Sequence, residues 1–182
     1  MKNLFIIIVF TLALVGIDFT MANAQDAEVT VSASVLGTID VQNVSNVNFG
    51  DVARGSTPYL DPTGVASTQV GIGTGSAESI GHVTVGGSEG AEVTITWNAP
   101  DELTLDGDPT VETNEIMAFT LEVNGLDSDD QSNSTEINTG ATPTLGSTGY
   151  FIWIGGDLTV GLEQTTGAYQ TEEPVTITVN YN

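Results

Sequence analysis

The C-terminal segment, residues 149–182, constrains the fold of this chain most strongly. It contains runs rich in β-branched and aromatic residues at 150–154, 157–160 and 175–182, and two glycines separate the first run from the second. Side chains along a strand alternate between two faces. In the final run one face is apolar or aromatic and the other is polar, with Val175, Ile177, Val179 and Tyr181 opposing Thr176, Thr178, Asn180 and Asn182. The final run therefore predicts a half-buried strand that closes the fold.

Similar short runs recur along the chain, at 28–36, 39–41, 47–52, 68–72, 82–86, 91–98, 103–105 and 116–123. No segment has apolar residues at helical spacing over the length that a helix needs. Many short strands with regular turn signals are typical of an antiparallel sandwich or a small barrel, and we favour the sandwich. We predict an all-β fold, an antiparallel immunoglobulin-like or pilin-like β-sandwich in a single domain. Around Met117 to Phe119 the pattern leaves open which side chains face inward.

The N-terminus has the order of a secretory signal peptide. Lys2 precedes an apolar run from Leu4 to Val15, and Ala22-Asn23-Ala24 provides a small-x-small cleavage site. A membrane anchor is the alternative, but the run is shorter than the ~20 apolar residues that cross a bilayer, and Asp18 follows it. We predict a signal peptide at 1–24 and a β-sandwich domain at 25–182. The protein is expected to be exported to the periplasm, the cell surface or the extracellular space, without membrane insertion after cleavage.

The net charge and the lack of cysteine limit which partners and which metal sites the protein can have. The formal net charge is −22, and the chain contains no cysteine. Such a surface repels phosphate backbones and anionic lipid head groups, so we expect no binding to nucleic acid. Without cysteine there is no disulfide and no thiolate metal site. The charge fits a saline or cation-rich habitat, in which salt screens self-repulsion, and it equally fits the ordinary solubility of a secreted protein.

Several motifs together resemble the bacterial domain-of-unknown-function family 4402. The resemblance spans the predicted domain and is carried by Phe49-Gly50-Asp51-Val52, Ile116 to Gly125, Gly155 to Gly161, Gln164, Gly167-Ala168-Tyr169 and Val175 to Tyr181. It implies an exported β-sandwich, similar in style to spore-coat-U and pilin-like domains. The family has no assigned activity, so the resemblance implies fold and export. The chain lacks the cysteine pair that is usual in pilins of chaperone-assembled fibres.

A polar, acidic stretch at 125–146 predicts a long exposed loop. Its carboxylates are hard oxygen ligands of the kind that calcium prefers, and the candidate ligands are Asp127, Asp129, Asp130 and Glu136, with Asn133 between them. The spacing does not match the helix-loop-helix calcium pattern, and a solvated acidic loop is the simpler interpretation. An extracellular module that binds calcium or a glycan through 127–136 is one functional hypothesis. Trp97, Trp153 and Tyr150 could stack on a sugar, although aromatic residues in sandwich strands more often belong to the core.

Catalytic signatures are weak, and we expect neither an enzyme nor a required cofactor. His82 is the only histidine, it falls within a predicted strand, and no Gly-x-Ser-x-Gly elbow precedes a predicted helix anywhere in the chain. The acid pairs Asp101-Glu102 and Glu172-Glu173 are the candidates for glycoside hydrolysis. Neighbouring residues of a strand point to opposite faces, so neither pair converges by itself.

The first predicted strand has two interpretations. Val29, Val31, Ala33 and Val35 alternate with polar residues directly after a short leader. The segment can be the domain's own first strand, or it can complete the sheet of a neighbouring copy by strand addition. Head-to-tail exchange does not close and therefore builds filaments. The sequence leads us to expect an exported structural or adhesive protein of the cell surface, a pilin-like subunit whose partners are further copies of itself or other surface proteins.

Overall fold

The computed structural model describes residues 32–73 and 77–182. The predicted signal peptide, residues 1–24, lies outside the described residues. Residues 35–182 form one compact unit. No helix in the described ranges is long and apolar enough to cross a membrane.

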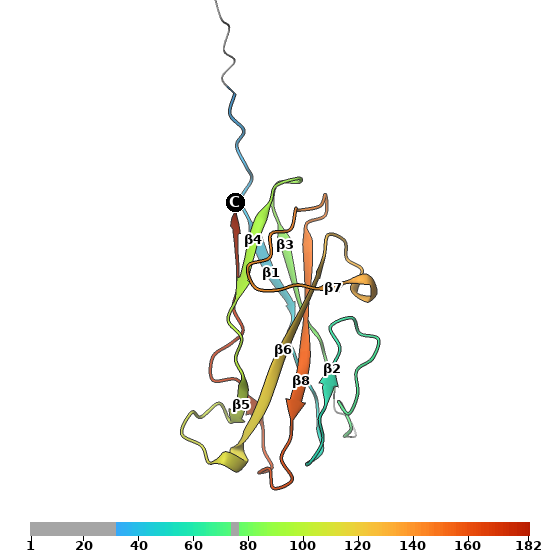
Figure 1. Ribbon diagram of the computed structural model, residues 1–182, viewed down its shortest axis with the longest axis vertical. Helices are drawn as coiled ribbons and strands as arrows, with labels where there is room; N and C mark the ends of the chain where they lie inside the picture. Colours follow the sequence, from blue (N-terminus) through green and yellow to red (C-terminus); the bar gives the residue numbers. More distant parts are fainter. Residues whose placement is uncertain (1–31, 74–76) are drawn as a thin grey trace, which may run out of the picture. The chain divides into compact units, whose positions relative to one another are not determined.

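The compact unit is built from strands, with two single-turn 3-10 helices. In chain order these are β1 (Asp40–Ser45), β2 (Tyr59–Leu60), β3 (Gly81–Gly86), β4 (Val93–Trp97), β5 (Glu102–Leu105), η1 (Thr113–Glu115), β6 (Ile116–Leu126), η2 (Gln131–Asn133), β7 (Thr135–Glu136), β8 (Tyr150–Thr159), β9 (Tyr169–Gln170) and β10 (Ile177–Tyr181). Figure 1 shows the long strands running side by side along the molecule.

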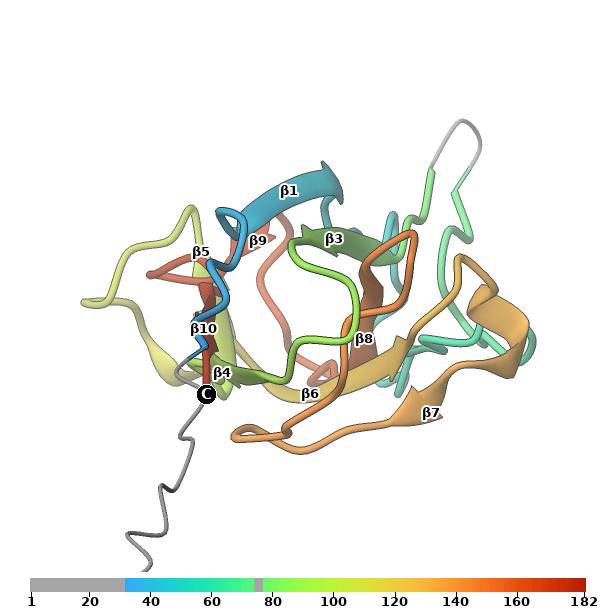
Figure 2. The same ribbon diagram turned by 90° about the horizontal axis from the view of Figure 1, so that it is seen from above.

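Two antiparallel sheets form the fold. The large sheet has the order β1-β3-β8-β6-β5-β9, with β2 added to β8 and β7 added to β6, and the small sheet consists of β10 and β4. Seen along the strands, the large sheet curls, and β4 and β10 lie opposite β3 (Figure 2). The structure therefore confirms the predicted all-β, antiparallel, sandwich-like fold.

Strand β8 is the centre of the large sheet. Its first half pairs with β3 from Tyr150 to Ile154, its far side pairs with β6, and Gly156 and Asp157 pair with β2. Gly155 and Gly156, which separate two runs in the sequence, lie inside one continuous strand. A Cβ atom at Gly155 would lie 2.0 Å from the carbonyl oxygen of Leu60, so the backbone of β2 approaches too closely for a side chain.

The core fills the space between the sheets in two clusters. One gathers around Val85, Ile95 and Ile152 between β3, β4 and β8, and β10 packs Ile177 and Val179 against it. This packing confirms the predicted inward face of the closing strand. The other cluster contains Phe49, Leu60, Met117, Phe119, Leu158 and Val160. Met117 and Phe119 are both buried, which settles the inward face of β6 that the sequence left open.

Three predicted strands differ from the structure. Residues 32–39, the described part of the predicted first strand and its continuation, include no strand. Residues 47–52 and 68–72 contribute single bridges, Asn48 to Ser79 and Thr68 to Tyr59. Positive φ angles interrupt both segments, at Gly50 (64°), Gln69 (57°) and Gly71 (55°). An extended strand cannot continue through such a residue.

Candidate functional site

Strand β1 forms one edge of the large sheet, whose other edge is β9, and β10 forms an open edge of the small sheet. In the described part of the chain β1 pairs only with β3, and β10 pairs only with β4. The other side of β4 is covered by residues 141–145, through hydrogen bonds such as Ile95 N–H to Ala141 O (2.9 Å). Figure 2 shows β1 beside β3 and β10 beside β4. Each open edge presents unpaired backbone N–H and C=O groups, which are able to pair with a further strand.

A groove with an apolar floor lies between β1 and residues that end at Ile177, the first residue of β10, and we call it the β1–β10 groove. Its volume is about 1170 Å³, larger than the ~300–1,000 Å³ of pockets that hold small ligands. Val41 of β1 lines one side, and residues 174–177, which lead into β10, line the other. The floor comes from inward side chains of β6 and β8, which are Met117, Phe119, Ile154 and Leu158. The groove thus reaches the core clusters from the surface.

A buried glutamine organises one end of the groove. Gln164 is 3% exposed, and its Nε2 donates to the carbonyl oxygen of Ile116 (3.2 Å) and to the hydroxyl of Tyr169 (3.0 Å). Its Oε1 accepts from the backbone N–H of Gly161 (3.2 Å). These bonds satisfy the buried amide and hold the turn after β8 against the start of β6.

The segment before β1 is exposed and tied down at one point. Val35 is 96% exposed. The N–H of Gly37 donates to Ser88 Oγ (2.6 Å), and the hydroxyl of Tyr181 donates to the carbonyl oxygen of Gly37 (2.9 Å). Ser88 N–H in turn donates to the Tyr181 hydroxyl (2.9 Å). The network, which we call the Gly37 clamp, fixes the chain at the C-terminal end of β10.

The four predicted calcium ligands lie apart on the loop after β6. All four are exposed: Asp127, Asp129, Asp130 and Glu136. The Asp130 carboxylate accepts hydrogen bonds from Asn133 Nδ2 (2.7 Å) and Ser132 Oγ (2.9 Å), and these lower its pKa. Among residues 32–73 and 77–182, no three His, Asp or Glu side chains group closely enough to hold a metal ion. Calcium binding by this loop stays a prediction.

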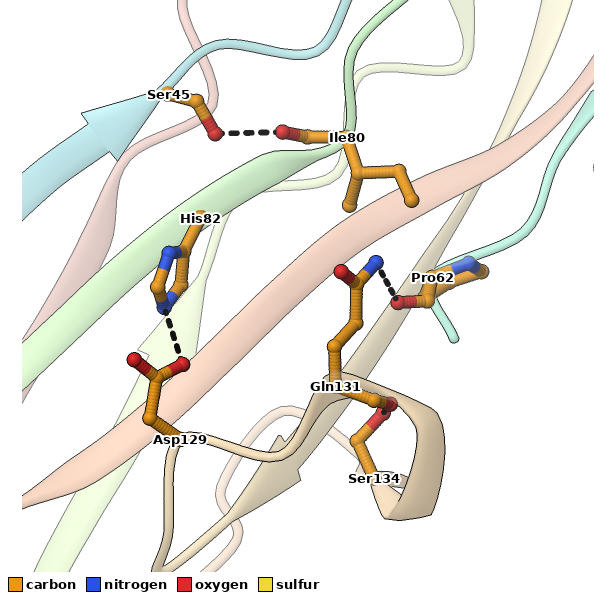
Figure 3. Close-up of polar contacts among 7 residues, drawn as sticks. All are labelled: Ser45, Pro62, Ile80, His82, Asp129, Gln131 and Ser134. Carbon is orange, nitrogen blue, oxygen red and sulfur yellow. Dashed lines mark hydrogen bonds and ion pairs between the residues drawn. The ribbon is translucent and has the colours of Figure 1, made fainter. Parts of the chain in front are cut away.

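The same loop is attached to the large sheet rather than fully exposed. Gln131 Nε2 donates to the carbonyl oxygen of Pro62 (2.9 Å), and Asp129 Oδ1 lies 4.0 Å from His82 Nε2 (Figure 3). Ser134 is buried, and its hydroxyl donates to the carbonyl oxygen of Gln131 (2.7 Å). Leu145 belongs to the core. The prediction of an exposed loop over 125–146 therefore holds for residues 127–130 but was wrong at Ser134 and Leu145, which are buried.

The aromatic residues proposed for sugar stacking are mainly core residues. Trp153 is 3% exposed and Tyr150 is 7% exposed, so neither presents a flat ring face to solvent. Burial, followed by the charge of Asp127, raises the pKa of Tyr150. The ring of His82 stacks on that of Trp153 with 5.3 Å between the ring centroids. His82 lies in strand β3, as predicted. These contacts give His82 a packing role.

The two acid pairs that the sequence singled out lie beside the same small cleft. The cleft has a volume of about 310 Å³ and is lined by residues 98–102 together with Glu172 and Glu173. The sequence could not show that segments so far apart would meet. The cleft sits at the start of β5 and is separate from the floor of the β1–β10 groove.

The family match covers all the residues that line the β1–β10 groove. Residues 39–181 match the family described as Domain of unknown function (DUF4402). A search of curated proteins found no match. The matched range holds β1 through β10, and therefore both edges of the groove, whereas residues 29–35 precede it. Because the match covers most of the chain, the protein belongs to the DUF4402 family, as the motifs of its sequence indicated.

Proposed function

We propose that the protein is an exported, non-catalytic structural subunit of the cell surface that assembles by strand addition into the β1–β10 groove. The observation that carries the proposal is a groove of about 1170 Å³ with an apolar floor, bordered by the open edge of β1 and by the segment that leads into the open edge of β10. A strand that enters the groove satisfies the unpaired backbone groups of both edges and places alternate side chains over the core.

The segment 29–35 has the properties of the added strand. Its apolar side chains, Val29, Val31, Ala33 and Val35, occupy alternate positions, so all four face one side when the segment is extended. At ~3.3 Å per residue the segment spans about 23 Å. The two edges are of comparable length, with six residues in β1 and five in β10.

Apolar burial and edge pairing provide the driving force. Each buried CH₂ group contributes ~0.8 kcal/mol, so three valines and an alanine at the floor of the groove supply several kcal/mol. The backbone gains hydrogen bonds on both sides, which an exposed edge lacks. When each copy gives its strand to the next, the exchange does not close, and filaments result.

The compartment and the charge agree with a surface role. The signal peptide order at 1–24 implies export, and a fold without cysteine does not depend on disulfide formation there. A net charge of −22 disfavours nucleic acid and anionic lipid as partners. A neutral apolar segment of another copy avoids this repulsion at the site of contact.

Single substitutions in the mature chain, residues 25–182, test the proposal. We expect the unchanged protein to form filaments, visible by electron microscopy and as high mass in light scattering. Val31→Asp places a charge toward the groove and is expected to abolish filaments. Ser32→Asp adds the same charge on the opposite face of the segment and is expected to leave them intact.

A competition experiment provides a second measurement. A synthetic peptide of residues 25–36, added in excess during assembly, should occupy the grooves and shorten the filaments. The same peptide with aspartate in place of Val31 should have no effect. A mature protein that remains monomeric at all concentrations, or filaments that persist in Val31→Asp, would refute strand addition.

A further inference from the structure

We infer that successive copies meet at a specific joint, in which Arg54 and Leu162 of the accepting copy contact the Ser88–Glu89 turn of the donating copy. The joint rests on the proposed function, since it exists only if a strand is donated. Beyond strand addition, the joint specifies how successive copies are oriented and which residues select the partner. It forms between one end of the accepting domain and the opposite end of the donating domain.

The first end contains Arg54, and we call it the Arg54 end. Arg54 lines the β1–β10 groove, in a turn whose next residue, Gly55, donates its N–H to the carbonyl oxygen of Gly161 (3.2 Å). This turn therefore lies just beyond Thr159, where β8 ends. Leu162 lies beside Gly55 and is 77% exposed.

The second end contains Glu89, and we call it the Glu89 end. Gly37 is bound there by Ser88 and by Tyr181, the last residue of β10, and Glu89 directly follows Ser88 and is exposed. Pairing of Val85 with Tyr150 places this end where β8 begins. The ten residues of β8 separate the two ends, and Figure 1 shows the terminus of β10 at the end opposite to the arrowhead of β8.

The head-to-tail order of the proposed filament sets the direction of the added strand. β10 runs toward the Glu89 end and β1 begins there, so a strand between them is antiparallel to one edge and parallel to the other in either direction. Head-to-tail exchange requires a strand that begins at the Glu89 end of the acceptor and finishes at its Arg54 end. The donated segment then leaves the groove with Val35 beside Arg54 and Leu162. The opposite direction would bring like ends of two copies together, and such an exchange closes as a pair.

The short connection forces the two ends together. Gly37 of the donating copy follows Val35 by two residues, about 7 Å at most, and the Gly37 clamp holds it at the donor's own Glu89 end. The Glu89 end of the donor must therefore lie against the Arg54 end of the acceptor.

The chemistry of the two ends is complementary. Lys2 and Arg54 are the only basic residues of a chain whose net charge is −22, and within the described residues no ion pair within 4.0 Å includes Arg54. Opposite Arg54, the joint places the exposed carboxylate of Glu89. Val35 is 96% exposed and Leu36 is 47% exposed, and both would lie beside the exposed side chain of Leu162. One unpaired cation thus offsets charge repulsion where two acidic bodies meet.

Charge reversal tests the joint in the mature chain. Arg54→Glu and Glu89→Arg should each raise the protein concentration needed for filament formation, on the order of tenfold, because like charges then face each other. The double variant R54E/E89R restores an opposite pair and should return this concentration to within about threefold of the unchanged protein. High salt should weaken the effect of each single change.

The control separates the joint from general charge effects and from the proposed function. Glu136→Arg changes the net charge as Glu89→Arg does, but on β7, and should not raise the concentration needed for assembly. If Val31→Asp abolishes filaments while R54E and E89R assemble normally, the joint is wrong and strand addition stands. The same conclusion follows if the double variant does not return the concentration needed for assembly toward that of the unchanged protein. If the unchanged protein never assembles, both are refuted.

Discussion

The hydroxyl of Tyr181 donates a hydrogen bond of 2.9 Å to the carbonyl oxygen of Gly37, which lies 144 residues earlier in the chain. The contact joins the last strand to the segment that precedes the first. Since Ser88 N–H donates to the same hydroxyl, one phenol oxygen connects three parts of the fold. It thereby determines where the N-terminal segment leaves the domain.

Tyr181→Phe should lower the free energy of unfolding by about 1–3 kcal/mol, because it removes two hydrogen bonds of the Gly37 clamp and leaves Ser88 N–H without its partner. Urea unfolding measures the change. Tyr150→Phe is the matched control, since the hydroxyl of Tyr150 has no hydrogen-bond partner among the described residues, and it should change stability by less than about 1 kcal/mol. Equal losses in the two variants would contradict a special role of Tyr181.

Gly156→Ala should destabilise the fold by at least about 3 kcal/mol. Gly156 has a φ of 134°, and a Cβ atom there would lie 1.9 Å from the carbonyl oxygen of Thr120 on β6. Gly90→Ala provides the comparison, because Gly90 also has a positive φ (77°) but open space around it. That variant should cost only about 1 kcal/mol in thermal or urea unfolding. A small loss at both positions would mean that β6 and β8 separate easily.

The positions of strands could be predicted from the sequence where apolar and polar residues alternate without interruption. The closing strand and β6 were predicted with nearly their observed bounds, because a half-buried strand needs one apolar face. The break expected at Gly155 and Gly156 was wrong. Glycine there reflects the close approach of Leu60 and Thr120 from neighbouring strands, which a single sequence does not display.

The groove was beyond sequence analysis for a related reason. Its floor comes from β6 and β8, and its sides come from β1 and the segment before β10, so it depends on sheet order rather than on any local motif. The alternation of residues 29–35 was the one local signal, and it indicated a strand without indicating which sheet receives it. Similarly, the exposed acids at 127–130 suggested a shared metal site, but their spacing could not show that Asp129 would lie near His82 instead.

Thermal stability should increase with salt. A net charge of −22 with only two basic residues produces self-repulsion that is screened over ~30 Å at 0.01 M and ~8 Å at 0.15 M ionic strength. Between these concentrations of sodium chloride we expect Tm to rise by at least about 3 °C, measured by circular dichroism. Near pH 4, where carboxylates begin to take up protons, the same salt step should give a smaller rise. A Tm that does not change with salt at neutral pH would show that the charges are too far apart for their repulsion to affect stability.

Asp61 should make the protein sensitive to acid. This carboxylate is 6% exposed, and although burial by itself raises its pKa, hydrogen bonds from Thr63 Oγ1 (2.7 Å) and from the N–H groups of Thr63 and Ala66 (both 2.8 Å) lower the pKa overall. The native pKa is therefore below the ~3.9 of an unfolded chain. The stabilisation is fully present above that value and is lost as pH falls through the native pKa.

The substitution Asp61→Asn tests this dependence, because an amide keeps the shape of the side chain but loses the charge and one acceptor. At pH 7 the variant should be less stable by about 1–3 kcal/mol in urea unfolding, and the difference from the unchanged protein should shrink as the pH falls below the ~3.9 of an unfolded carboxylate. Glu173→Gln removes the same charge from an exposed position and should have little effect. A difference that stays constant from pH 7 to pH 3 would mean that shape, rather than the ionised carboxylate, holds the turn after β2 in place.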